Sequence, residues 1–105
     1  MCYYLPVRII SRRTLRSFWE GPLHGDSEKP LRAWFAEAKK ANWRTPGDLK
    51  AQYRHASILG NGRVVFNIGG NKYRLIVAIR YEFRLVFIRF VGTHEQYDRI
   101  KAEEV

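Results

Sequence analysis

The alternation of apolar and polar residues divides the chain into a helical first half and a strand-forming second half. A short apolar run at residues 7–10 predicts a strand. Apolar side chains then recur every three or four positions in residues 12–20, and again from Ser27 to about Ala41, which predicts two amphipathic helices. A threonine, a proline and an aspartate open a third helical segment, which we expect to run over residues 45–53. The predicted N-cap residues are Ser11, Ser27 and Thr45.

The second half of the chain has the period of two that is typical of strands. It begins after the turn dipeptide Asn61-Gly62. The predicted strands are residues 63–68, 73–80 and 84–91. Residues 69–71 are two glycines and an asparagine, which tolerate positive φ and so suit a tight hairpin, and residues 82–83 are a candidate two-residue loop.

The order of these elements predicts an α+β fold. A short helix at about residues 95–103 closes the chain, and residues 56–59 are ambiguous between an extended loop and an edge strand. The order β-α-α-β-β-β-α favours a compact domain in which an antiparallel sheet packs its apolar face on the N-terminal helices. At 105 residues, we expect a single domain over residues 1–105, with residues 1–5 as a frayed extension.

Composition and charge narrow the class of partner. Nineteen Lys and Arg against ten Asp and Glu give a net charge of +9, which favours an anionic partner such as nucleic acid or an acidic protein surface. No apolar run approaches the roughly 20 residues that span a bilayer, and no signal peptide is recognisable, so we expect a cytoplasmic protein with no membrane association. One cysteine and three scattered histidines predict neither a metal site nor a cofactor.

Arginines inside the predicted strands indicate a phosphate site. If residues 82–83 form the second loop, Arg74 lies opposite Val91, and Arg74 and Arg89 become diagonal neighbours on one face. Arg80 shares that face, and Asn67 joins it if the first hairpin closes on residues 70 and 71. Two neighbouring guanidiniums repel each other unless an anion lies between them, and a phosphate can accept paired hydrogen bonds from each. The alternative is a solvated face with weak surface ion pairs. The opposite face then carries the apolar layer Tyr73, Leu75, Val77, Ile79, Val86, Ile88 and Phe90.

His94 and Tyr97 follow the last predicted strand. They are three residues apart, so on a helix they point to the same side. A histidine titrates near neutral pH and can move protons, and a tyrosine can donate a hydrogen bond or stack on a base. Equally, such a histidine can be a surface or capping residue and such a tyrosine a core residue.

Three sequence blocks carry a family resemblance: I-I-S-R-R-T-L at residues 9–15, R-V-V-F-N-I-G-G-N-K-Y-R-L at 63–75 and I-R-F-V-G-T-H-E-Q-Y-D at 88–98. In these blocks the chain resembles the HigB family of type II toxins, within the RelE/ParE toxin superfamily. The resemblance implies a compact RelE-like fold and an mRNA interferase, an endoribonuclease that cleaves mRNA, usually on the ribosome. It also implies a HigA-like antitoxin with a helix-turn-helix domain as partner.

The resemblance also implies roles for single residues. By position, Arg74 and Arg89 match strand arginines that act on the scissile phosphate, while His94 and Tyr97 match residues that assist proton transfer. Asn67 stands where many RelE-like relatives have an arginine. The residues expected to contact RNA are Arg63, Asn67, Lys72 and Arg80.

The expected reaction is metal-independent attack of a ribose 2′-hydroxyl on the adjacent phosphorus, which would restrict cleavage to RNA. Two alternatives stay open, a ParE-like protein that binds gyrase and a non-catalytic RNA-binding domain.

Overall fold

The structure is a computed structural model that describes residues 7–105, so the extension expected at residues 1–5 lies outside the described residues. Within this range, a five-stranded sheet has the order β1-β5-β4-β3-β2. The strands are β1 (Arg8–Ile10), β2 (Ser57–Ile58), β3 (Arg63–Ile68), β4 (Tyr73–Arg80) and β5 (Leu85–Thr93). The helices are α1 (Arg12–Trp19), α2 (Glu28–Lys40), α3 (Pro46–Gln52) and α4 (His94–Tyr97), with short 3-10 turns at Gly25–Ser27 and Tyr81–Phe83. The α+β class is confirmed, and the arrangement is consistent with a RelE-like fold.

The sheet is mixed, which corrects the prediction of an antiparallel sheet. Strands β2 to β5 are antiparallel neighbours, but β1 runs parallel to β5, with Arg8 paired to Leu85. Strand β1 joins the sheet through the long helical segment that follows it and not through a hairpin, and side-chain periodicity alone does not encode strand direction. The ambiguous residues 56–59 contain β2, a short edge strand paired with β3.

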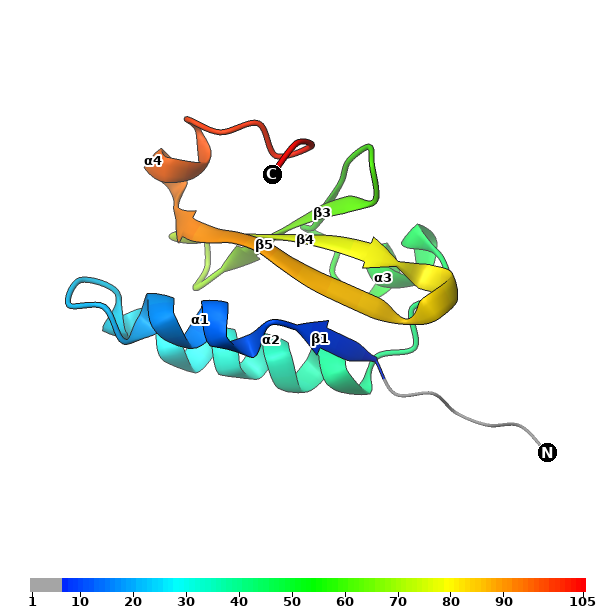
Figure 1. The fold of residues 1–105 in the computed structure, drawn as a ribbon, viewed down its shortest axis with the longest axis horizontal. Coiled ribbons are helices and arrows are strands. Elements are labelled where there is room, and N and C mark those ends of the chain that lie inside the picture. The colour runs from blue at the N-terminus through cyan, green and yellow to red at the C-terminus, as the bar shows by residue number, and fades with distance from the viewer. Residues whose placement is uncertain (1–6) are drawn as a thin grey trace.

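Helices α1 and α2 cover one side of the sheet, which we call the inner face (Figure 1). The core lies between these two helices and the inner face of the sheet. The helices contribute Leu15, Trp19, Leu31, Trp34 and Ala38, and the strands contribute Val64, Phe66, Ile68, Tyr73, Leu75, Val77, Ile79, Val86 and Ile88. Complete burial stabilises such a side chain by roughly 1.5 to 3 kcal/mol relative to exposure. The fold is therefore anchored from this side.

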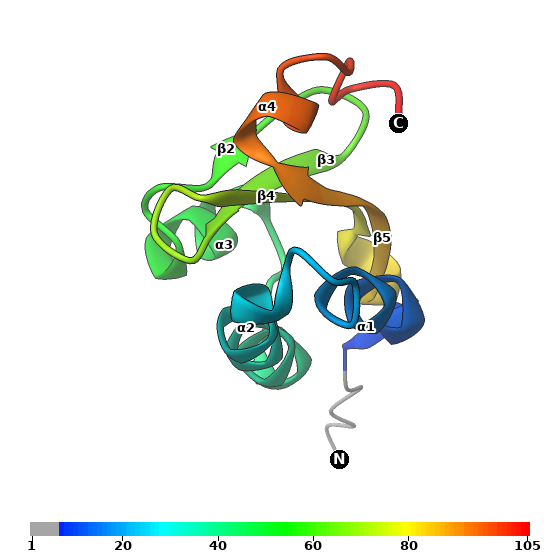
Figure 2. The same ribbon diagram turned by 90° about the vertical axis from the view of Figure 1, so that its left-hand side faces the viewer.

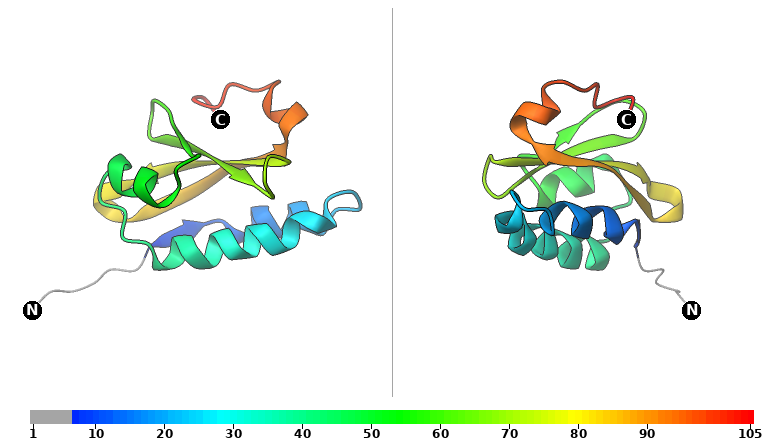
Figure 3. Two further views of the ribbon diagram at one scale, coloured as in Figure 1. Left: turned by 180° about the vertical axis from the view of Figure 1, so that it is seen from behind. Right: turned by 60° about the vertical axis from the view of Figure 1, so that its left-hand side comes forward.

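The opposite side of the sheet, the outer face, carries α4 and the C-terminal segment (Figures 2 and 3). The predicted helix at residues 95–103 is shorter than expected, because α4 ends at Tyr97 and turns follow it. Its start is fixed by Thr93, whose side chain accepts a hydrogen bond from the Gln96 backbone while the Gln96 side chain accepts one from the Thr93 backbone. This capping box holds α4 directly after β5, over the outer face.

The local signals differ in how well they predicted caps and turns. Thr45 caps α3 as expected, forming a capping box with Asp48. Ser11 and Ser27 occupy N-cap positions without capping hydrogen bonds, and the Ser27 hydroxyl instead donates to the carbonyl of His24 at 2.6 Å. Gly69 and Gly70 have φ of 63° and 70°, as the first hairpin requires. The second connection is longer than the two residues predicted, since β4 ends at residue 80 and β5 begins at residue 85.

Candidate functional site

The strand register places Arg74 at one end of the outer face. Arg74 lies opposite Asn67 of β3, as predicted. Between β4 and β5 the predicted register holds near the turn, where Arg80 pairs with Leu85, but it shifts between Ile76 and Val77. Arg74 consequently lies opposite Gly92, and the prediction that it lies opposite Val91 is wrong by one residue.

The shift is caused by a bulge at Arg89. Ile88 pairs with Val77 and Phe90 pairs with Ile76, so Arg89 has no partner in the ladder. Phe90 therefore shares the outer face with Ile76, and Val91 packs against the core in its place. The apolar layer predicted for the inner face is therefore wrong at Phe90, whose place is taken by Val91. A bulge leaves little signal in a sequence, because it adds one residue without breaking the apolar pattern on either side.

The bulge also separates the two arginines predicted to be diagonal neighbours. The Arg74 guanidinium contacts Asn71, in the hairpin after β3, and its Cζ lies 5.9 Å from the Tyr97 ring centroid. The Arg89 guanidinium lies over the ring of Phe87, at 5.6 Å, toward the turn that joins β4 and β5. The guanidiniums are thus directed to opposite ends of the outer face.

Arg74 is a buried cation without an acidic partner. It is 8% exposed. Its Nη1 donates to the carbonyls of Asn71 at 3.0 Å and Tyr73 at 3.3 Å, and its Nη2 donates to Asn71 Oδ1 at 2.8 Å. No carboxylate pairs with it among the described residues. Neutral oxygens satisfy these donors but leave the positive charge uncompensated, and a buried charge of this kind favours an anion beside it.

Helix α4 brings Tyr97 and His94 to the same end of the outer face. Tyr97 is half-buried, with its ring beside Arg74. The His94 backbone donates to the Lys72 carbonyl at 3.3 Å, and its Nδ1 lies 3.1 Å from Asp98 Oδ2. This contact orients the imidazole. Because Nδ1 faces Asp98, Nε2 is the ring nitrogen left for another partner.

Lys72, predicted to contact RNA, is engaged by the 3-10 turn before α2. Its ammonium forms an ion pair with Asp26, which also accepts a hydrogen bond from the Tyr73 hydroxyl. The hydrogen bond from Lys72, and after it in size the hydrogen bond from Tyr73, hold the pKa of Asp26 below its usual value. The pKa of Lys72 is raised by the same carboxylate. The Lys72 charge is therefore largely neutralised within the fold.

The other predicted RNA-contacting arginines lie at the second end of the outer face. Arg63, Arg80 and Arg89 line a shallow hollow of about 320 Å³ together with Phe83 and Phe87. We call these five residues the arginine hollow. Arg63 donates to the carbonyls of Val105 at 2.9 Å and Asn61 at 3.0 Å, while Arg80 and Arg89 are exposed.

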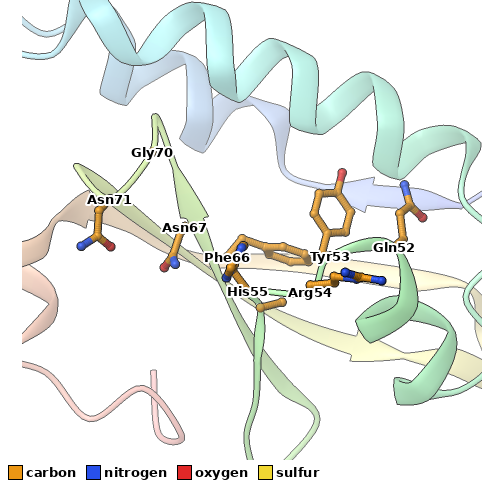
Figure 4. Close-up of a pocket in the computed structure, with 9 residues that line it drawn as sticks. Gln52, Tyr53, Arg54, His55, Phe66, Asn67, Gly70 and Asn71 are labelled. Atoms are coloured by element: carbon orange, nitrogen blue, oxygen red, sulfur yellow. The ribbon is translucent and has the colours of Figure 1, made fainter.

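A cavity of about 650 Å³, lined in part by Asn67 and Asn71, was not predicted from the sequence (Figure 4). Its lining residues come from the end of α3 and the segment that follows it, from β3 and from the first hairpin: Gln52, Tyr53, Arg54, His55, Ala56, Phe66, Asn67, Gly70 and Asn71. Asn67 and Asn71 connect it to Arg74, the first across the ladder and the second by hydrogen bonds. Arg54 and His55 had no local signal, because only the folded chain brings them beside β3.

Residues 7–105 hold no cluster of three or more His, Cys, Asp or Glu side chains that could bind a metal ion, and none of their helices is long and apolar enough to cross a bilayer.

Comparison with known proteins gives the family. Residues 27–100 match the HigB_toxin family, described as the RelE-like toxic component of a toxin–antitoxin system. The mRNA interferase toxin HigB of Escherichia coli K12 is 32% identical to this chain over 65 residues, and the mRNA interferases HigB of Escherichia coli O157:H7 and Shigella flexneri are equally similar. Each alignment covers 60% of this chain and 62% of the relative. Because the family match spans well over half of the chain and includes Arg74, His94 and Tyr97, the chain belongs to the HigB toxin family of RelE-like toxins.

Proposed function

We propose that this protein is an mRNA interferase, an endoribonuclease that acts as the toxin of a type II toxin–antitoxin system. The observation that carries the proposal is the buried, unpaired guanidinium of Arg74 beside the Tyr97 ring. Transfer of a phosphoryl group needs preorganised positive charge where negative charge develops, and a cation already held in place supplies it without reorganisation. The family membership and the names of the relatives support the same activity.

The proposed reaction is a transesterification within the RNA strand. A ribose 2′-oxygen forms a bond to the adjacent phosphorus as a general base takes its proton, and the bond from phosphorus to the 5′-oxygen of the next nucleotide breaks as a general acid protonates that oxygen. The products are a 2′,3′-cyclic phosphate and a 5′-hydroxyl. The step is proposed to need no metal, and its dependence on the 2′-hydroxyl would restrict it to RNA.

Each of the predicted residues then has a distinct role. Arg74 stabilises the charge on the phosphoryl oxygens through the Nε–H and the Nη2–H that the Asn71 and Tyr73 oxygens do not use. Tyr97 and His94 act as general acid and base, with Asp98 orienting the imidazole. Asn67, exposed and opposite Arg74, contacts the RNA near the same phosphate.

The arginine hollow holds the RNA strand and takes no part in the bond changes. Arg63, Arg80 and Arg89 gather around two phenylalanines, a combination that binds single strands through phosphate contacts and base stacking. The role first expected for Arg89, at the scissile phosphate, came from the family resemblance and from a register that made it a diagonal neighbour of Arg74. With the bulge in place, we assign Arg89 to strand binding.

The partners follow from the family. We propose that the substrate is mRNA in the cytoplasm, presented on the ribosome, and that a HigA-like helix-turn-helix antitoxin neutralises the toxin. The net charge of +9 favours all of these partners, since RNA is a polyanion and an acidic antitoxin surface would complement the outer face.

Cleavage can be tested with purified protein, a defined transcript and ribosomes. We expect discrete new 5′ ends with hydroxyl termini, matched by 2′,3′-cyclic phosphates upstream, and unchanged cleavage in excess EDTA. Arg74→Ala should abolish these ends, whereas Arg13→Ala, which removes an exposed charge from α1 on the far side of the molecule, should retain them. Intact transcripts together with DNA-damage signalling on expression in cells would overturn the proposal in favour of a gyrase-binding toxin.

A further inference from the structure

Residues 101–105, which we call the strap, lie over the outer face of the sheet. The chain leaves α4 through turns and runs back across the strands (Figures 1 and 3). The strap is folded on itself, because the backbones of Glu104 and Val105 donate to the Lys101 carbonyl at 3.0 and 3.2 Å. It therefore spans the outer face from α4 toward the arginine hollow.

The strap binds directly to Arg63, one of the arginines proposed to hold RNA. Arg63 Nε donates to the Val105 carbonyl at 2.9 Å, and Asn61 Nδ2 donates to the Glu103 carbonyl at 3.3 Å. Arg63 Nη1 also donates to the Asn61 carbonyl at 3.0 Å. A guanidinium can bind a phosphate side-on, with parallel hydrogen bonds from Nε and one Nη. Because the strap occupies Nε, Arg63 cannot bind a phosphate in this way while the strap is in place.

Few contacts hold the strap on the sheet. Within it, Ala102 and Val105 are half-buried and the other three residues are exposed. None of its charged side chains forms an ion pair within residues 7–105. A hollow of about 350 Å³ lies between the strap and the chain around Leu59 and Asn61, so the packing there is loose. Segments with few buried contacts open at a low cost in free energy, and the strap has the properties of such a segment.

The strap also brings negative charge to a positive surface. Glu103 and Glu104 are exposed and outnumber the one basic residue of the strap, Lys101. Carboxylates beside an arginine-rich surface attract the arginines and repel the phosphates of an approaching RNA strand. The carbonyl oxygen at Arg63 Nε and these two carboxylates thus resemble a short anionic ligand that belongs to the protein itself.

We propose that the strap is an autoinhibitory segment that competes with RNA for Arg63. When an RNA strand occupies the arginine hollow, the Val105 carbonyl leaves Arg63 Nε and a phosphate oxygen takes its place. RNA binding is then weakened according to the fraction of molecules in which the strap is closed. A strap closed in about 70 to 90% of molecules raises Kd for RNA roughly threefold to tenfold. This inference rests on the proposed function, because it takes the ligand of the hollow to be RNA.

The test measures RNA binding without cleavage. A fluorescent 2′-O-methyl oligoribonucleotide of about 12 nucleotides, which lacks the attacking hydroxyl, is titrated with the protein and followed by anisotropy. Deletion of residues 101–105 should tighten binding by roughly threefold to tenfold. Asn61→Gly removes the side-chain hydrogen bond to Glu103 and suits the φ of 58° at this position, so it should shift Kd in the same direction by less.

A matched control separates competition for Arg63 from simple loss of negative charge. The same deletion in an Arg63→Gln background removes the same carboxylates but releases no guanidinium, so the gain in affinity should disappear. Motion of the strap is measured in the ¹⁵N-labelled protein with no deletion. Saturation with the oligonucleotide should lower the heteronuclear NOE of the amides of residues 101–105, because the displaced strap becomes mobile.

Three results would overturn the inference: unchanged affinity in a folded deletion variant, an equal gain in both backgrounds, or unchanged strap NOE values at saturation. If the deletion variant does not fold, Asn61→Gly and the NOE values decide. Failure of the inference is distinguishable from failure of the proposed function. Cleavage of a transcript by a protein whose strap stays in place would reject the strap mechanism alone. Release of the strap by the oligonucleotide, without cleavage of any transcript, would reject the endoribonuclease and leave the competition for Arg63.

Discussion

The two ends of the outer face hold arginines in opposite physical states. At the α4 end, Arg74 is 8% exposed and is fixed by hydrogen bonds to Asn71 and Tyr73. At the other end, Arg80 and Arg89 are exposed, and the Arg89 guanidinium lies over the Phe87 ring without an ion pair among the residues described. A guanidinium held in one position can stabilise developing charge at one atom, whereas exposed guanidiniums can follow a polyanion without a fixed geometry.

This difference teaches that two arginines on one face of a sheet need not serve one phosphate. Removing the fixed arginine should chiefly lower kcat. Removing exposed ones should chiefly raise KM and weaken the dependence of binding on salt.

The largest expected effect belongs to Arg74→Lys. Lysine keeps the charge but cannot reproduce the hydrogen bonds to Asn71 or present a fork of donors to a phosphate. We expect kcat for a defined transcript to fall by roughly 100- to 1,000-fold, as when one preorganised donor is removed. Circular dichroism should show a folded protein. If Arg74→Lys stayed within about threefold of wild type while Arg89→Lys lost activity, Arg89 and not Arg74 would be the arginine that stabilises the developing charge.

Substitution of Tyr97 or His94 should give the next largest effect. Tyr97→Phe keeps the ring beside Arg74 and removes only the hydroxyl, and His94→Gln removes the imidazole. We expect kcat to fall by about 100-fold for the residue that transfers the proton in the slow step. Comparison of kcat for the two variants at one fixed pH identifies it, because the larger loss marks the residue that transfers the proton. Full activity in both variants would remove α4 from the mechanism.

Much of the fold was predictable because it follows from local chemistry. The capping box at Thr45 and the glycines at 69 and 70 are signals read within a few residues of the chain. The direction of β1 was not predictable in this way, because pairing of Arg8 with Leu85 depends on how helices return the chain to the sheet. Ser27 also looked like a cap, but it ends the 3-10 turn Gly25–Ser27, and its hydroxyl donates to the His24 carbonyl at the start of that turn.

The sequence predicted which residues form the candidate site better than it predicted their positions relative to one another. The pairing of Asn67 with Arg74 followed from the hairpin glycines. The bulge at Arg89 separated that residue from Arg74, and an ion pair with Asp26 withdrew Lys72. Neither event has a signature in the strand itself, since each depends on residues distant in sequence. The same reason hid the cavity formed by α3, β3 and the first hairpin.

The arginine hollow should respond to substitution with smaller changes, and in binding more than in catalysis. In the double variant Arg80→Gln/Arg89→Gln, we expect KM for a long transcript to rise by roughly threefold to tenfold, with kcat little changed. The slope of log affinity against log salt concentration should flatten by about 0.7 for each phosphate that the variant no longer neutralises. Fluorescence anisotropy on a labelled single strand measures this slope. Lys39→Gln is the control, because it removes a charge from α2 on the other side of the sheet. An unchanged salt slope would show that the hollow does not bind RNA.

The smallest effect concerns Lys72, which lies near the Arg74 end but is neutralised by Asp26. The pKa of Asp26 is lowered in the fold, so the pair stabilises the protein above the unfolded value of about 3.9, and this contribution is lost as pH falls through the folded pKa. The pKa of Lys72 is raised, so the contribution is also lost as pH rises through the folded pKa of Lys72, beyond about 10.4. Asp26→Asn should therefore lower Tm by about 1 to 3 °C near pH 7, with a smaller difference at pH 2.5. Because the substitution also frees the Lys72 ammonium, the salt slope of RNA binding should become steeper. A steeper slope would mean that Lys72 can join the RNA-binding surface, and an unchanged slope in a folded variant would mean that its position, and not its ion pair, keeps it from the RNA.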